Sequence, residues 1–453
     1  MVFSSIFFLF YFFPIVFIVN KLLPRKYKNL WLFFASLFFY AWGEPIYILI
    51  MLFSTFFDYT NGRLMVGASD QKKKLILINS IVVNLGILFF FKYSDFFIKV
   101  INEFGFNIKP LNLALPLGIS FYTFQTLSYT IDCYRGRVNI ADNIVDFGLF
   151  VTSFPQLIAG PIVKYIDVEK ELKQRDDSLN SYNVGMRIFI EGLFLKVLLA
   201  NKFGEVFNSF TFADASSKTL IFLKLVAYSL QIYFDFAGYS KMAIGMGRML
   251  GFHFPENFNY PYISKSITEF WSRWHMTLSS WFKEYVYIPL GGNRVGRARH
   301  IFNIFVVWFL TGFWHGADYN FILWGMYFFV VLILEKYFFL KILEKVPKFI
   351  SRIYTLIIIM FSWVLFTSTD LKDIGAFFTS LGSKPFFSGE VTSFLLQYGI
   401  LFIIGILFST PKPKEMFEKQ KEAVQIVMLT IVFILSIAAL VAGNYNPFLY
   451  FRF

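Results

Sequence analysis

The sequence predicts an all-α protein that crosses a membrane many times. Of its 453 residues, 57% are hydrophobic and only 16% are charged, a balance too apolar for a soluble globular protein of this length. A helix needs about 20 apolar residues to cross a hydrocarbon core of about 30 Å, and stretches of roughly that length recur along the chain. We therefore expect a polytopic membrane protein with about ten to twelve membrane-embedded helices.

Nine apolar stretches are expected to form continuous helices. They are residues 2–19, 30–42, 75–91, 220–236, 301–313, 321–334, 353–366, 394–408 and 426–442. Two more, 113–131 and 147–162, are interrupted by Pro and Gly, which indicates re-entrant or broken helices. The longest hydrophilic stretch, 164–182, is only long enough for a loop or a surface helix. The whole chain, 1–453, is therefore expected to be one integral-membrane domain.

Basic residues predict the orientation of the chain. Lysines and arginines cluster in the loops at 21–28, 63–74 and 135–137, which are separated by pairs of spans. Because short loops rich in Lys and Arg stay in the cytoplasm, the amino terminus is expected outside. The first apolar segment lacks a basic start and a small-residue cleavage site, so we expect it to be retained as a span. The net charge of +13 then indicates orientation and contact with anionic membrane lipid, and no binding of nucleic acid.

Two of the four histidines lie in unusual surroundings. His315 follows an apolar helix in the run Gly-Phe-Trp-His-Gly-Ala-Asp, where flanking glycines allow close approach of backbone or ligand and Gly316 is a helix end signal. A histidine in a low-dielectric site tends to be neutral, as a general base must be. A buried histidine bonded to a carbonyl is the structural alternative. His300 is interpreted as a solvated loop residue, and His253 lies at a helix end.

His275 lies in a segment that is expected to be one amphipathic helix over 266–284. Ser266 and Glu269 have the spacing of a capping box, which places the helix start. The helix is too polar to span lipid, so it suits the interface or the wall of a water-filled cavity. An aromatic membrane belt that happens to contain a histidine is the alternative.

Two further polar clusters interrupt the apolar body. Asp235 follows an apolar run and, if buried, needs a partner such as Lys241 or Arg273. Gln156 lies in a Phe-Pro-Gln-Leu-Ile-Ala-Gly-Pro run that breaks a helix at membrane depth. Helix packing is the alternative for either cluster, and for the individual residues it is the favoured interpretation. The chain has one cysteine and no metal-type spacing of His and Cys, so no metal site is predicted.

Taken together, these segments resemble the membrane-bound O-acyltransferase (MBOAT) family, and its bacterial branch most of all. The matching segments, weak singly but specific in their order, are 41–43, 154–161, 233–241, 255–261, 270–275, 287–294 and 312–316. The resemblance implies a ring of about 11 transmembrane helices, with re-entrant and interfacial helices, around a central tunnel. It also implies N-terminal helices over 1–140, a catalytic core over 141–345, and C-terminal helices with an aromatic tail over 346–453.

The resemblance also assigns expected roles to residues. His315 matches the catalytic histidine of the family, and His275 matches its second functional position. Trp274, Arg273, Asp235, Gln156 and Trp314 are the candidates for tunnel or substrate contacts. The carboxyl-terminal run 446–453 resembles a family tail whose tyrosine is proposed as a transient acyl carrier, and Tyr450 holds that position here. An aromatic interface anchor is the alternative reading of Tyr450.

The expected activity is transfer of an acyl group, acetyl in our first hypothesis, across the membrane to an exported cell-wall or extracellular polysaccharide. The donor would be a cytoplasmic thioester, acetyl-CoA or an acyl carrier, with no bound cofactor. With no predicted domain outside the membrane, we expect an extracytoplasmic O-acetyltransferase as partner and a bacterial cytoplasmic-membrane location. D-alanylation of teichoic acid is the alternative within the class. An acyl or lipid transporter, and a non-catalytic scaffold, are the alternatives from other classes.

Overall fold

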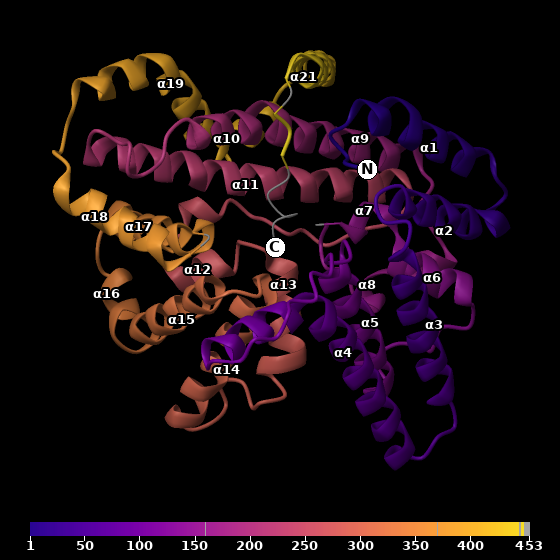
Figure 1. The fold of residues 1–453 in the computed structure, drawn as a ribbon. Helices are drawn as coiled ribbons and strands as arrows, with labels where there is room; N and C mark the ends of the chain where they lie inside the picture. The colour runs from indigo at the N-terminus through magenta and orange to yellow at the C-terminus, as the bar shows by residue number, and fades with distance from the viewer. Residues whose placement is uncertain (159, 369, 444, 448–453) are drawn as a thin grey trace. The chain divides into compact units, whose positions relative to one another are not determined.

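The structure is a computed structural model that describes residues 1–158, 160–368, 370–443 and 445–447, and in these ranges it contains helices and no strand (Figure 1). The chain forms two compact units. Unit 1 comprises Met1–Phe189 and Tyr239–Glu256, and unit 2 comprises Ile190–Gly238 and the chain from Asn257 onward. Helices α9 and α11 each pass from one unit into the other.

The helices up to α9 begin in unit 1. They are η1 (Phe8–Phe12), α1 (Phe13–Leu22), α2 (Arg25–Ala41), α3 (Ile48–Leu64), α4 (Asp70–Glu103), α5 (Ile119–Tyr134), α6 (Ile144–Thr152), α7 (Phe154–Leu157), α8 (Tyr165–Lys173) and α9 (Leu179–Phe194). Within this unit α5 packs against both α3 and α4, and α2 packs against α6.

The later helices begin in unit 2. They are η2 (Leu195–Ala200), α10 (Asn201–Asn208), α11 (Lys218–Met249), η3 (Pro261–Ile263), α12 (Ile267–Trp271), α13 (Met276–Phe282), η4 (Lys283–Tyr287), α14 (Arg297–His315), α15 (Tyr319–Leu334), η5 (Glu335–Phe339), α16 (Leu340–Leu343), α17 (Lys348–Thr367), α18 (Leu371–Ser383), α19 (Gly389–Phe408), α20 (Lys412–Glu418) and α21 (Glu422–Ala442). Of these, α14 and α15 lie side by side (Figure 1).

The helical character of the predicted spans is confirmed. Each of the nine continuous apolar stretches coincides largely with a helix or with two consecutive helices. Among the described residues five helices are long and apolar enough to cross a membrane: α4, α11, α17, α19 and α21. Two shorter apolar helical segments are Phe8–Leu22 and Ile144–Leu157. The total number of spans stays a prediction.

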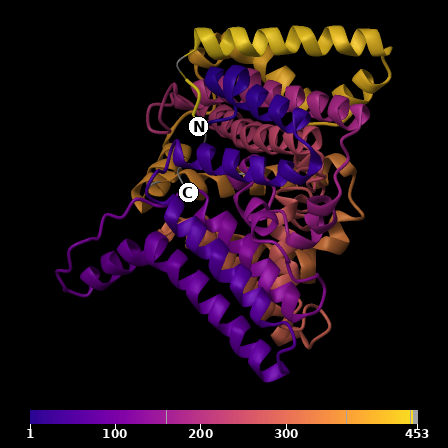
Figure 2. The ribbon, with the colours of Figure 1, turned by 90° about the vertical axis from the view of Figure 1, so that its right-hand side faces the viewer.

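Helix α4 is longer than a membrane requires. Its 34 residues extend about 51 Å, against a hydrocarbon core of about 30 Å. Figure 2 shows this helix in purple, with the loop that follows it at its far end. In that loop Phe104 is 81% exposed and Phe106 is 63% exposed.

The segment 147–162 is broken in the structure, whereas of 113–131 only the first six residues lie outside a helix and 119–131 belong to the continuous helix α5. Gly118, with a φ of +73°, is the N-cap of α5, and a Cβ there would lie 2.7 Å from the carbonyl oxygen of Leu157. Helix α6 ends at Thr152, and α7 begins two residues later, where the N–H of Phe154 donates to the Ser36 hydroxyl at 3.1 Å. A side-chain hydroxyl therefore satisfies backbone that the helix break exposes.

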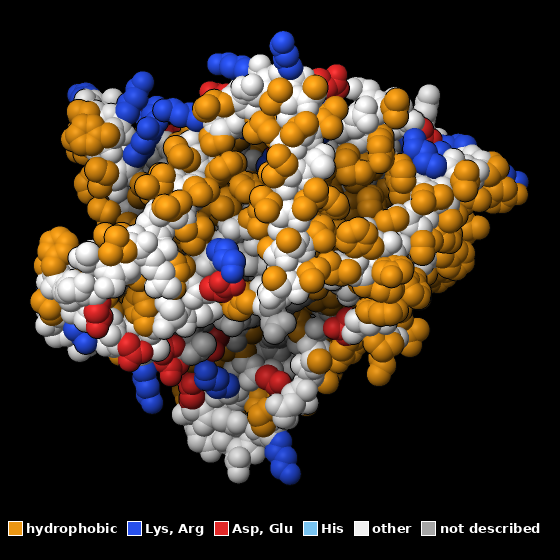
Figure 3. All heavy atoms as spheres, turned by 90° about the horizontal axis from the view of Figure 1, so that it is seen from above, with side chains coloured by type: hydrophobic (Ala, Val, Ile, Leu, Met, Phe, Trp, Pro, Cys, Tyr) orange, Lys and Arg blue, Asp and Glu red, His pale blue; other side chains and the backbone are white. Residues whose placement is uncertain are grey.

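Much of the surface is apolar. Hydrophobic side chains cover a large part of the face in Figure 3, with Lys and Arg gathered in a few places. On α19, Leu396 is 83% exposed and Ile400 is 75% exposed. A contiguous apolar surface of this kind is unfavourable in water, but it is the expected surface of a helix in lipid.

Candidate active site

His315 is the last residue of α14, and it is 7% exposed. Its ring packs edge-on against three aromatic rings, with centroid distances of 5.0 Å to Trp324, 5.1 Å to Trp314 and 5.5 Å to Phe366. The helix ends there because the backbone at Gly316 is extended. The structure therefore holds this imidazole at a helix end, inside an aromatic enclosure in unit 2.

Glycines bring α14 and α15 into close contact, and of the two neighbours that the sequence allows at Gly312, backbone or ligand, the structure shows backbone. A Cβ on Gly312 would lie 2.4 Å from the carbonyl oxygen of Phe321, and one on Gly325 would lie 2.4 Å from the carbonyl oxygen of Trp308. No larger side chain fits between these two backbones without moving them. The close approach places Trp324, on α15, against the His315 ring.

The prediction of one continuous helix over 266–284 is wrong, although its start is confirmed. The Ser266 hydroxyl accepts the N–H of Glu269 at 3.0 Å and begins α12, but α12 ends at Trp271. His275 then adopts a left-handed conformation, with φ +45° and ψ +51°, and α13 begins at Met276. Hydrophobic periodicity is insensitive to such a turn, because the residues on either side keep the helical spacing.

Contacts from another segment impose the turn. The backbone of Asn257 accepts the N–H of Met276 at 2.9 Å, and the N–H of Asn259 donates to the carbonyl of Arg273 at 2.9 Å. Glu335, in η5, fixes the other end of the segment. Its carboxylate accepts the N–H groups of Ile267 and Thr268 at 2.7 and 2.8 Å. Sequence reasoning missed Asn257 and Glu335, since neither belongs to the segment that they hold.

His275 is 1% exposed, and its Nδ1 lies 3.1 Å from Oδ1 of Asn257. Its ring contacts Phe236 and Trp314, with centroid distances of 4.7 and 6.1 Å. The residue lies between two short helices, outside the membrane-spanning segments, and burial lowers the pKa of His275 to about 3. The imidazole is therefore neutral at physiological pH. Trp314 contacts both predicted histidines, so unit 2 brings them together around one indole ring.

The neighbouring tunnel candidates Trp274 and Arg273 have packing and pairing partners of their own. Trp274 is 4% exposed and stacks on Phe270 in the aromatic core of unit 2. Arg273 Nε donates to the Glu269 carboxylate at 3.0 Å, and Nη1 donates to the Asn259 carbonyl at 3.1 Å. The structure thus shows Arg273 as one half of an ion pair with Glu269.

For Asp235 the structure shows an ion pair with Lys196, at 2.7 Å, rather than with Arg273. Both side chains are almost fully buried, at 1% for Lys196 and 4% for Asp235. Lys196 Nζ also donates to Oδ1 of Asn201 at 2.9 Å and to the carbonyl of Pro447. Sequence reasoning missed this lysine, which lies within the apolar run of η2. A single charged residue in such a run is the signal that could have identified it.

Gln156 lies in unit 1. It is 1% exposed on α7, and its amide nitrogen donates to the carbonyl of Phe150. The same unit holds His253, whose Nδ1 lies 2.5 Å from the Glu171 carboxylate and whose N–H donates to it at 2.8 Å. These contacts close the turn after α11.

A cavity of about 280 Å³ in unit 2 is lined by His275. The other lining residues are Thr268, Trp271, Ser272, Leu278, Ser279, Phe282, Lys283, Tyr287, Val307, Trp308, Thr311 and Leu332.

His300 lies near this cavity's Tyr287, whose hydroxyl is hydrogen-bonded to Nε2 of His300 at 3.1 Å. The hydroxyl of Tyr337 is hydrogen-bonded to Nδ1 of His300 at 2.7 Å. His300 is 6% exposed, so its interpretation as a solvated loop residue is wrong. His300 lies in the first turn of α14, which buries it against the two tyrosines.

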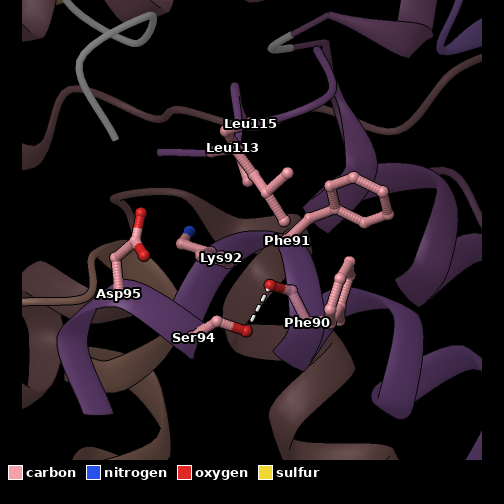
Figure 4. Close-up of a pocket in the computed structure, with 7 residues that line it drawn as sticks. All are labelled: Phe90, Phe91, Lys92, Ser94, Asp95, Leu113 and Leu115. Atoms are coloured by element: carbon pink, nitrogen blue, oxygen red, sulfur yellow. Dashed lines mark hydrogen bonds between the residues drawn. The ribbon is translucent and has the colours of Figure 1, made fainter. Parts of the chain in front are cut away.

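A second, smaller cavity lies in unit 1, at about 160 Å³ (Figure 4). Lys92 and Asp95 of α4 line it together with Leu113 and Leu115 from the extended segment before α5. Lys92 Nζ donates to the Ser120 hydroxyl at 3.3 Å. This polar group begins directly after the apolar stretch 75–91, and sequence reasoning missed it.

Tyr450 lies outside the described residues. The residues that precede it contact η2 and α10 of unit 2. The Tyr445 hydroxyl accepts from the Asn208 amide at 2.6 Å, and the Asn446 side-chain oxygen accepts from Asn201 at 3.2 Å. With the Pro447 contact to Lys196, the beginning of the aromatic tail is fixed on the buried ion pair.

Comparison with known proteins identifies the family. Residues 70–374 match the profile of the membrane-bound O-acyltransferase family, a range that includes both His275 and His315. The chain belongs to this family. The predicted membrane O-acyltransferase is thereby confirmed at the level of the family, and the helical architecture described above agrees with it.

Three bacterial proteins illustrate what this MBOAT protein is similar to. It is 34% identical to the probable alginate O-acetylase of Azotobacter vinelandii over the full length of both chains. It is 36% identical to the peptidoglycan O-acetyltransferase of Helicobacter pylori, over 82% of this chain and 78% of that one. The teichoic acid D-alanyltransferase of Bacillus subtilis is more distant, with 30% identity over 51% of this chain.

Proposed function

We propose that this chain transfers an acetyl group from a cytoplasmic thioester to the hydroxyl of an exported polysaccharide. Two relatives, which match 100% and 82% of the chain, are named for O-acetylation of alginate and of peptidoglycan. The observation that carries the proposal is the contact of His275 and His315 with the one ring of Trp314. Two buried imidazoles in one aromatic enclosure can handle a proton away from bulk water.

In the proposed reaction His315 is the general base. It takes the proton of an attacking hydroxyl while the hydroxyl oxygen forms a bond to the thioester carbonyl carbon. The tetrahedral intermediate collapses, the carbon–sulfur bond breaks, and the leaving thiolate receives the proton from His315. The products are an oxygen ester and a free thiol, so no oxidant or bound cofactor is needed. The donor is acetyl-CoA or an acetylated carrier.

The first acceptor in this scheme is Tyr450, which then passes the acetyl group outward. The anchoring of Asn446 and Pro447 on unit 2 supports this step, because it ties the start of the tail to the unit that holds both histidines. A phenol is a weak nucleophile without an adjacent base, so the scheme requires a base at the acceptor. Tyr450→Phe is expected to abolish passage of acetyl groups to the outside, while transfer at the normal rate would refute the carrier step.

An extracytoplasmic O-acetyltransferase is the proposed partner, because the longest hydrophilic stretch of the sequence, 164–182, is too short to form a polymer-binding domain. The proposed location is the bacterial cytoplasmic membrane, with the amino terminus outside and anionic lipid around the basic loops. A Ser69→Cys variant in a Cys133→Ser background tests the orientation. An impermeant thiol reagent added to intact cells is expected to leave residue 69 unlabelled, and labelling would reverse the assignment.

The test of the catalytic assignment is acetyl transfer from labelled acetyl-CoA by purified protein in lipid nanodiscs. His315→Ala is expected to lose about 10²- to 10⁴-fold in rate, the usual contribution of a general base, while the folded protein is retained. His253→Ala is the matched control, since that histidine pairs with Glu171 in unit 1. Undiminished transfer by well-folded His315→Ala would overturn the role of His315.

The substrate class is tested in whole cells. Mild alkali releases ester-linked groups from the cell envelope and exopolymer, and deletion of the chain is expected to remove released acetate. Loss of released D-alanine instead would favour teichoic acid D-alanylation, the activity named for the more distant relative. An unchanged ester content, together with loss of an acyl or lipid flux, would indicate a transporter.

A further inference from the structure

Asn257 precedes η3, is fully buried, and meets the turn that carries His275. Its side-chain oxygen lies 3.1 Å from Nδ1 of His275. The same oxygen accepts from the hydroxyl of Thr277 at 2.9 Å and from the N–H of Thr277 at 3.3 Å. One amide oxygen thus contacts the imidazole and the first turn of α13 together.

These contacts fix which ring nitrogen of His275 carries hydrogen. A backbone N–H only donates, so the Asn257 atom that faces Thr277 is the carbonyl oxygen and not the amide nitrogen. A carbonyl oxygen only accepts, and Nδ1 of His275 must therefore donate to it. A neutral imidazole carries one N–H, which leaves Nε2 with a lone pair.

The remaining ring nitrogen, Nε2, is left without a partner in the described part of the chain. Nε2 of His275 is buried and has no hydrogen-bond partner among the residues that the structure describes. His275 also lines the cavity of about 280 Å³ in unit 2. Because a buried polar atom without a partner destabilises the protein, a donor group that reaches Nε2 would gain by binding it. The left-handed backbone at His275 adds a local cost that other contacts must offset.

We propose that Asn257 is a positioning residue that fixes His275 as the Nδ1–H tautomer, so that Nε2 accepts a hydrogen bond from an N–H or O–H group of the substrate. This inference rests on the proposed acetyl transfer for the identity of the substrate. The donor group is either the attacking hydroxyl or the amide N–H of the thioester's pantetheine arm. In both cases Nε2 of His275 accepts a hydrogen bond. It therefore cannot donate one to the negatively charged oxygen of the tetrahedral intermediate.

Nitrogen NMR of the full chain tests the tautomer directly. Protein labelled with ¹⁵N-histidine in nanodiscs at pH 7 gives ring signals for four histidines, and His275→Asn identifies the pair that belongs to His275. We expect an unprotonated Nε2 and a protonated Nδ1. Asn257→Asp keeps an accepting oxygen and should preserve this pattern, whereas Asn257→Leu should give a mixture of tautomers. A protonated Nε2 in the wild-type protein would overturn the proposal.

Kinetics supply the second measurement. Asn257→Leu is expected to lower kcat about 10- to 100-fold, the effect of one buried hydrogen bond, with a smaller change in KM. Asn257→Asp should restore most of the rate. Asn303→Leu is the matched control, because Asn303 is also fully buried but donates to the Gly292 carbonyl. Full kcat in a folded Asn257→Leu variant would refute a positioning role.

Two thioester donors distinguish the source of the hydrogen bond. If the pantetheine amide supplies it, the loss caused by Asn257→Leu appears with acetyl-CoA and disappears with S-acetyl-2-mercaptoethanol, which has no amide. If the attacking hydroxyl supplies it, the loss is the same with both donors. Should Asn257→Leu fail to fold, the spectra of wild type and Asn257→Asp still decide the tautomer. Should the wild type transfer no acetyl group, the proposed function fails while the spectra still test Asn257.

Discussion

Replacement of Glu335 by alanine is expected to loosen α12 and, with it, the turn that presents His275. Glu335 is fully buried, and its carboxylate accepts from the N–H of Ile267 at 2.7 Å, the N–H of Thr268 at 2.8 Å and the hydroxyl of Thr268 at 2.6 Å. Helix α12 has five residues, so these bonds engage two of the few N–H groups at its start. A helix this short does not persist without such contacts.

The magnitude follows from the number of bonds. A hydrogen bond to a charged group contributes about 1.5–3 kcal/mol, so loss of the two backbone bonds lowers the free energy of local opening by about 3–6 kcal/mol. At 1.4 kcal/mol for each factor of ten, amide protection at Ile267 and Thr268 should fall by about 10²- to 10⁴-fold. Acetyl transfer should fall in parallel, because His275 loses its fixed position.

Hydrogen–deuterium exchange of the nanodisc-embedded protein measures this effect in peptides that cover residues 264–276. Glu344→Ala is the control, since Glu344 is exposed at the end of α16 and should leave exchange unchanged. Glu335→Gln keeps one accepting oxygen and should fall between wild type and alanine. Unchanged protection of Ile267 and Thr268 in Glu335→Ala would show that the carboxylate does not hold α12.

Three further predictions concern stability. Lys196→Met should lower the free energy of unfolding by about 3–5 kcal/mol, because it breaks a buried ion pair with Asp235. Lys196→Met/Asp235→Asn should recover most of this loss in a thermal unfolding assay, and equal losses in the two variants would contradict a coupled pair. Gly312→Ala should lower the free energy of unfolding by about 1–3 kcal/mol, because the new methyl group forces α14 away from α15. Gly399→Ala should leave it unchanged, because a Cβ there meets nothing within 4 Å. Equal Tm values for the two variants would refute the contact. Burial lowers the pKa of His275 to about 3, so between pH 3 and about 6.5 the unfolded chain binds a proton more readily than the folded chain does. The contribution of His275 to the free energy of unfolding should therefore be complete above pH 6.5 and fall below it, by up to about 1.4 kcal/mol per pH unit. His275→Asn should show a shallower fall.

The sequence was most informative where one local signal sufficed. Apolar length located the helices that later appear as α4, α17, α19 and α21, because the requirement for backbone hydrogen bonds in lipid leaves few alternatives to a helix. The Ser266 cap and the glycine contact at Gly312 were likewise recognisable from neighbouring residues.

Contacts between distant segments could not be predicted in this way. The turn at His275 depends on Asn257, 18 residues earlier, and on Glu335, 60 residues later in the chain. Neither partner alters the helical spacing around His275, so the break has no periodic signature. The ion pair of Asp235 with Lys196 was missed for a similar reason, since Lys196 lies in another helix and 39 residues away.

The π turns of unit 2 constrain how this chain can change in length. Lys196 lies in η2 and Glu335 begins η5, and a π turn is equivalent to one residue inserted into an α-helix. Deletion of a single residue from either turn would restore regular α-helix there, so the residues of the turn, the charged one included, would point in a different direction or be lost. Among related chains, a one-residue gap at either position should therefore accompany loss of the corresponding lysine or glutamate.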